Sequence, residues 1–141
     1  MPEEEVRYVE YSKHDAQAGE DGAEKTLTVS IEDSADGAAI VILSGELDLG
    51  TVPRMEGALL EQLEQRPAVL VDLSGLSFID SSGIAALIEA KRGADGIPLG
   101  FLVGPGSQVD RVFGIAGIGD TLRLFSDRQV AMTALAPRGG D

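Results

Sequence analysis

The chain has 141 residues, with 24 acids against 11 bases, a formal net charge of −13 and no cysteine. This length predicts one domain, and the missing cysteine excludes disulfides, zinc–thiolate sites and thiol chemistry. The negative charge repels phosphate backbones and anionic lipid, so we expect no nucleic-acid partner, and the acidity serves either solubility or a partner with a basic surface.

The first 25 residues are acidic and lack a structural period. They contain eight acids and three bases, a net charge of −5, and one patch with two tyrosines at Tyr8 and Tyr11. Such a composition is typical of a chain that buries too little apolar surface to fold. We therefore expect a mostly disordered arm over residues 1–25, a folded domain over 26–137 and a frayed tail over 138–141.

Two strands are predicted next. Residues 27–31 alternate strictly between apolar and polar, as a half-buried strand does, and residues 39–43 form an apolar run. The turn pair at Asp36 and Gly37 lies between them, which predicts a hairpin. Ser44 and Gly45 are expected to break the second strand.

A helix should follow. Thr51 can cap it, Pro53 fits its first turn, and Pro67 should end it. Its apolar residues recur at helical spacing and predict one buried stripe: Val52, Met55, Leu59, Leu60 and Leu63. Residues 68–71 are then continuously apolar, which is typical of a strand buried on both faces. A polar stretch separates that strand from the apolar residues 76–79.

The rest of the chain continues this alternation. A small-residue helix is expected over about 82–92 and a buried strand over 99–103. Ser107 should cap a third helix that ends at Gly117. Residues 122–125 predict a short strand, and residues 126–129 read as a capping box that opens a last helix.

The predicted order β-β-α-β-α-β-α-β-α indicates an α/β fold, with helices packed against a small mixed sheet whose centre is largely parallel. In such sheets, functional loops follow the carboxyl ends of the parallel strands. The turn over residues 80–83 and the loop over residues 46–48 both join a strand to a helix. We expect both of them on the same rim.

Residues 78–84 read F-I-D-S-S-G-I and offer a serine on a strand-to-helix turn. A nucleophilic serine needs a base, but the only histidine, His14, is in the arm, and Lys91 is roughly 15 Å further along the helix. Ile79 also occupies the first glycine position of a G-x-S-x-G elbow around Ser81. We therefore expect no catalytic residue and no enzyme, and nothing in the sequence predicts a cofactor or metal. Helix capping and presentation of a serine to a partner such as a kinase remain as alternatives.

Several segments together resemble one known family. Residues 44–48 (S-G-E-L-D), 71–76 (V-D-L-S-G-L), 78–84 and 112–118 (V-F-G-I-A-G-I) occur in the order and spacing of the STAS domain of bacterial anti-sigma factor antagonists. The resemblance covers roughly residues 27–136. It implies a small sheet with helices packed against it, in agreement with the predicted elements.

The resemblance also implies a function. Family members bind a serine-kinase anti-sigma factor and so release a sigma factor, and a PP2C-type phosphatase reverses the kinase's action. By position, Ser81 is the implied phosphorylation site, and the resemblance implies partner contacts at Asp48, Asp80, Ser82, Gly83 and Ile84. Ala85 occupies a position at which many family members have a second glycine, so this sequence differs from the family pattern there. A non-switching STAS scaffold, or a subunit of a lipid-transport or stress-signalling assembly, is the alternative.

The expected charges agree with a switch in which phosphorylation of Ser81 controls binding to the partner. A phosphoserine carries about −1.5 to −2 charges, and a helix N-terminus tolerates such a group. The same charge beside Asp80, in a packed interface, would weaken binding.

The sequence further predicts a monomer or weak dimer. With no apolar run near roughly 20 residues and an acidic N-terminus, it also predicts a cytoplasmic protein without a membrane span.

Overall fold

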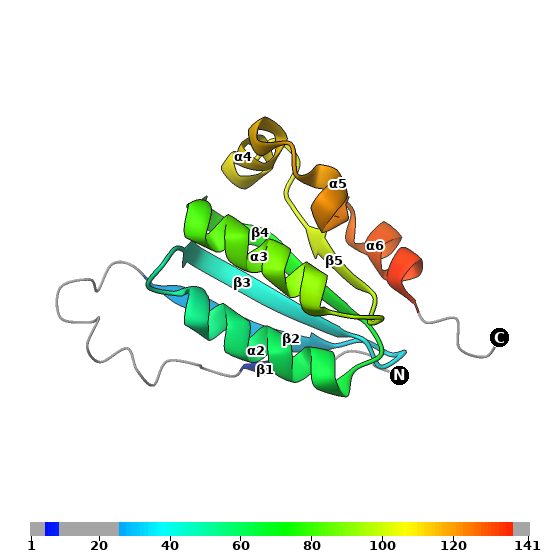
Figure 1. Ribbon diagram of the computed structural model, residues 1–141. Helices are drawn as coiled ribbons and strands as arrows, with labels where there is room; N and C mark the ends of the chain where they lie inside the picture. Colours follow the sequence, from blue (N-terminus) through cyan, green and yellow to red (C-terminus); the bar gives the residue numbers. More distant parts are fainter. Residues whose placement is uncertain (1–4, 9–25, 137–141) are drawn as a thin grey trace.

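The computed structural model describes residues 5–8 and 26–136, and for residues 5–8 it describes the backbone alone. Strands and helices alternate after an initial group of three strands (Figure 1). The strands are β1 (Glu5–Tyr8), β2 (Leu27–Asp33), β3 (Ala39–Leu47), β4 (Val69–Ile79), β5 (Leu99–Leu102) and β6 (Leu124–Phe125). The helices are α2 (Val52–Gln65), α3 (Ser81–Gly93), α4 (Gln108–Ala116), α5 (Gly119–Leu122) and α6 (Arg128–Leu135).

The six strands form one sheet in sequence order, from β1 to β6. β1, β2 and β3 pair antiparallel, whereas β3 to β6 pair parallel to one another. The predicted hairpin is therefore confirmed as β2 and β3, which turn at Gly37 with a φ of 94°. In the parallel half of the sheet, helices connect one strand to the next. The loops of this half therefore alternate between the two ends of the sheet.

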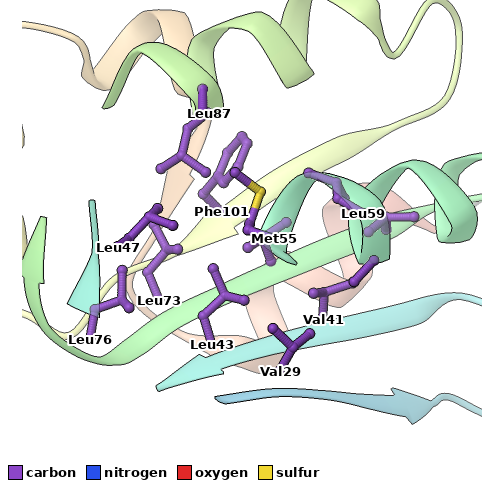
Figure 2. Packing of buried hydrophobic residues seen from close by; sticks show 14 of the residues in the cluster. Val29, Val41, Leu43, Leu47, Met55, Leu59, Leu73, Leu76, Leu87 and Phe101 are labelled. Carbon is purple, nitrogen blue, oxygen red and sulfur yellow. The ribbon is translucent and has the colours of Figure 1, made fainter. Parts of the chain in front are cut away.

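Each face of the sheet has its own core. On one face, alternate residues of β2 to β5 pack against α2, α3 and α4, and Figure 2 shows Leu47, Leu73, Leu87, Met55 and Phe101 converging there. On the other face α6 supplies Ala131 and Leu135, which pack on a smaller cluster from β3, β4 and β5. Each fully buried leucine of this kind contributes roughly 1.5–3 kcal/mol to folding. The two cores hold the strand ends, and so the loops that follow them, in fixed positions.

β3 and β4 are longer than the sequence predicts. The expected break at Ser44 and Gly45 is instead an irregular stretch of a continuous β3, where the register with β4 shifts. Gly45 takes a φ of 111° and passes close to the backbone of Thr26, and a Cβ at Gly75 would lie 3.0 Å from the Leu43 carbonyl oxygen. The extra residues of these irregularities lie in β4, between Asp72 and Gly75 and between Leu76 and Phe78, and such bulges bend a strand without ending it.

The structure adds two short elements to the predicted order. Residues Glu5–Tyr8 form β1 within the arm that was expected to be mostly disordered, because they pair with the exposed edge of β2. The short helix α5 takes up Leu122, so the last strand is reduced to Leu124–Phe125. The remainder of the arm and the tail 138–141 lie outside the described residues.

Two helix caps also differ from expectation. Asp127, rather than Ser126, is the N-cap of α6, and its side chain accepts a hydrogen bond from the Val130 amide at 2.9 Å. Thr51 occupies the cap position of α2 but makes no side-chain cap bond. The caps at Ser107 and Gly117 of α4 are confirmed, and Gly117 takes the left-handed φ of 69° that favours glycine.

Candidate functional site

The loops after β3 and β4 lie side by side at one rim of the sheet. α2 and α3 both begin at this rim, on the left in Figure 1. Leu47 pairs with Ile79 at the strand ends, and the Asp80 amide donates to the Leu47 carbonyl oxygen at 3.2 Å. The predicted common rim is therefore present, and a backbone hydrogen bond joins its two loops.

Asp80 alone makes the cap of α3. Its Oδ1 accepts a hydrogen bond from the Gly83 amide at 3.0 Å, and its carbonyl oxygen accepts from the Ile84 amide at 3.0 Å. Ser81 is exposed and Ser82 is half-buried. Within residues 26–136, neither serine hydroxyl has a hydrogen-bond partner. Capping therefore does not account for the two serines, and the Ser81 hydroxyl is open to solvent.

Gly83 serves packing rather than contact with the outside. It is buried, and a Cβ built on it would lie 2.7 Å from the Leu47 carbonyl oxygen and 2.8 Å from Ile79 Cγ1. Real Cβ atoms do not come so close, so any larger residue must push β3 and α3 apart. Ile84 is half-buried and packs against the larger core. Of the residues expected at the turn, Ser81 is thus the one classed as exposed.

Asp48 organises the neighbouring loop. It is 9% exposed, and its Oδ1 accepts hydrogen bonds from the Gly50 amide at 3.0 Å and the Thr51 amide at 3.1 Å. The Thr51 hydroxyl in turn donates to the Glu46 carbonyl oxygen at 2.8 Å. These bonds form an Asx turn of the kind that aspartate favours in loops. The direct role of Asp48 in the structure is to shape this turn.

Two apolar residues at the rim were not predicted as site residues. Leu49 is 74% exposed at the tip of the loop that Asp48 shapes, and Phe78 is 38% exposed two residues before Asp80. We call Leu49, Phe78 and Ser81 the rim patch. Leu49 could have been found in the sequence, since a leucine between an Asx turn and a glycine has little opportunity to enter the core. Phe78 could not, because the bulge in β4 changes which face each later residue occupies.

Within the described residues, no side chain that could act as a base is hydrogen-bonded to the Ser81 hydroxyl. Lys91 lies ten residues along the same helix, roughly 15 Å away at 1.5 Å per residue, and His14 lies outside the described residues. Over the described ranges, no three acidic or histidine side chains gather as metal ligands would.

Residues 31–131 match the model of the STAS domain family. The anti-sigma-F factor antagonist RsfB of Mycobacterium tuberculosis is 32% identical over 120 residues, which are 84% of this chain and 95% of that protein. The chain therefore belongs to the STAS-domain family of anti-sigma factor antagonists.

Solved structures agree with this assignment. An anti-sigma factor antagonist from Mycobacterium paratuberculosis superposes with a TM-score of 0.72 at 27% identity, covering 80% of this chain and 97% of that one. The unphosphorylated form of the antagonist SpoIIAA gives a TM-score of 0.60 at 20% identity, covering 76% and 96%, and this likeness concerns the fold alone. The fold class predicted from the sequence is confirmed.

None of the helices in the described part of the chain combines the length and apolar character needed to cross a bilayer.

Proposed function

We propose that this protein binds a serine-kinase anti-sigma factor through the rim patch and thereby releases a sigma factor in the cytoplasm. Its family membership and its relation to an anti-sigma-F factor antagonist support this function. The observation that carries the proposal is the exposed Ser81 hydroxyl at the start of α3, beside a cap that Asp80 completes without it. An exposed, unbonded serine on a rigid turn is accessible to a kinase.

The rim patch has the composition of a docking surface. A few residues near the centre of an interface usually provide most of its binding energy. Leu49 and Phe78 provide exposed apolar side chains, and the backbone bond between Asp80 and Leu47 holds their two loops together. The two loops are thus already joined before binding, which lowers the entropic cost of association.

Phosphorylation of Ser81 would switch this surface off. The phosphate would sit at the N-terminus of α3, where free amides and the helix dipole tolerate a negative charge, so the fold should persist. In a packed interface, the same charge must be desolvated beside Asp80. A cost of about 2.8 kcal/mol would weaken binding roughly 100-fold. A PP2C-type phosphatase would restore binding by removing the phosphate.

Kinase treatment followed by intact-mass measurement tests the proposal. The wild-type protein, Ser81→Ala and the matched neighbour Ser82→Ala are incubated with the cognate anti-sigma kinase and ATP. The proposal predicts one phosphate on the wild type and on Ser82→Ala, and none on Ser81→Ala. If the wild type binds the kinase but gains no phosphate, the protein is a non-switching STAS scaffold or assembly subunit instead.

A further inference from the structure

A groove of about 310 Å³ runs between α2 and α3, which lie side by side on one face of the sheet (Figure 1). It lies apart from the rim patch, and its floor is the outer edge of the larger core, to which Leu59 and Ala86 belong. Its α2 wall consists of larger side chains, and its α3 wall of small ones: Glu56, Leu59, Leu60 and Leu63 from α2, and Ala86, Glu89, Ala90 and Gly93 from α3.

The walls of the groove are largely apolar and partly open to solvent. Leu60 is 58% exposed, although the hydrophobic stripe of α2 predicts it to be buried with Leu59 and Leu63. Ala86, Ala90 and Gly93 have small side chains or none, so the backbone of another helix can approach α3 closely. Apolar side chains along a groove between two helices form the kind of surface into which a third, amphipathic helix can lay its apolar face.

The charges beside the groove indicate what kind of helix. Glu56 on α2 and Glu89 on α3 are exposed, and the residues that line the groove include no lysine or arginine. Glu89 forms an ion pair with Arg92 at 3.2 Å, but both side chains are about two-thirds exposed, so the pair contributes little and can be exchanged. The apolar floor favours leucine-like side chains, and the acidic rims favour basic residues on both flanks.

We propose that the groove binds an amphipathic helix of a protein partner, with leucine-like residues on its buried face and lysine or arginine on its flanks. A second copy of this chain fits less well, because its net charge of −13 would face the same acidic rims. A fatty acid fits less well, because its carboxylate would approach Glu56 or Glu89. The proposal needs neither Ser81 nor a sigma factor and does not depend on the proposed function.

Two designed peptides of about 16 residues test the charge argument. Both form the same leucine-faced amphipathic helix, but one carries lysine on its polar face and the other glutamate. Titration calorimetry measures affinity for the full-length protein, and backbone amide shifts locate the site. We expect saturable binding of the lysine peptide, with the largest shifts in residues 56–63 and 86–93, and no binding of the glutamate peptide.

Matched variants separate groove binding from general attraction to an acidic protein. Leu60 and Val130 are both 58% exposed, so Leu60→Ala should weaken binding about tenfold and Val130→Ala less than twofold. Glu56→Gln should weaken it about threefold, and Asp120→Asn, which removes an equal charge on α5, should have no comparable effect. Absence of saturable binding, amide shifts spread over the whole surface, or equal losses in the matched variants would overturn the proposal. The proposal would also be overturned if the wild-type protein self-associates and Leu60→Ala abolishes that self-association. The groove would then hold a second copy of the chain.

Discussion

The Cα of Gly83 faces the carbonyl oxygen of Leu47 so closely that a Cβ would lie 2.7 Å from it. This contact joins the start of α3 to the end of β3. Together with the hydrogen bond from the Asp80 amide to the same carbonyl oxygen, it fixes the position of Ser81 relative to the loop that carries Leu49. Packing between β3 and α3 thus requires the glycine of the D-S-S-G turn. Ser81, two residues before that glycine, is held in place as a consequence.

Gly83→Ala should destabilise the fold by about 1–3 kcal/mol, since the added methyl group must displace Leu47 or Ile79. Gly57→Ala is the matched control, because Gly57 lies within α2 and a Cβ there meets nothing within 4 Å. The control should raise stability by about 0.5–1 kcal/mol, as alanine is the better helix former. Urea unfolding measures both. Equal effects of the two changes would mean that the close contact at Leu47 has no energetic weight.

Asp80→Ala should cost about 1 kcal/mol, because the Gly83 amide loses its side-chain acceptor. Asp127→Ala removes the corresponding cap of α6, where Asp127 accepts from Val130, and should cost a similar amount. Only Asp80→Ala should slow phosphorylation of Ser81 by the cognate kinase, because only this cap orients the turn. Thermal unfolding and phosphate incorporation measure the two effects separately. If both variants slowed phosphorylation equally, general destabilisation would explain the result.

Leu49→Ala should weaken the complex with the anti-sigma kinase about tenfold and leave the midpoint of thermal unfolding nearly unchanged. Leu49 is 74% exposed, so truncating it removes little buried surface from the free protein. Ile115→Ala is the control, since Ile115 on α4 is 88% exposed and lies outside the rim patch. Surface plasmon resonance measures both affinities. An unchanged affinity for Leu49→Ala would remove this residue from the docking surface.

Periodicity and turn residues predicted the central elements well because each has a strong local cause. The alternation of residues 27–31, the turn at Gly37 and the αL cap at Gly117 all correspond to observed features. The irregular stretch at Ser44 and Gly45 was misjudged as a break, since a glycine that ends a strand and one that lies within an irregular strand look the same in sequence. β1 was missed because its stability comes from pairing with β2, which lies far along the chain.

For the candidate site too, some features could be predicted from the sequence and others could not. The strand-to-helix position of Ser81 and the common rim could be predicted, because both depend on the order of the elements. The separate tasks of Asp80 as cap, Asp48 as the organiser of a loop and Gly83 as a packing residue depend on which atoms meet in three dimensions. The exposure of Phe78 likewise follows from the bulge in β4, which short-range patterns do not encode.

The most direct measurement compares unmodified protein with protein phosphorylated at Ser81, for both kinase affinity and thermal unfolding. The phosphorylated form is purified after kinase treatment, and Ser81→Asp and Ser81→Ala accompany it. We predict that phosphorylation weakens binding roughly 100-fold and changes the unfolding midpoint by less than about 2 °C, since the phosphate is tolerated at the helix N-terminus. Equal affinity of the two forms would contradict the account, and so would a large loss of stability that explains the weaker binding by itself.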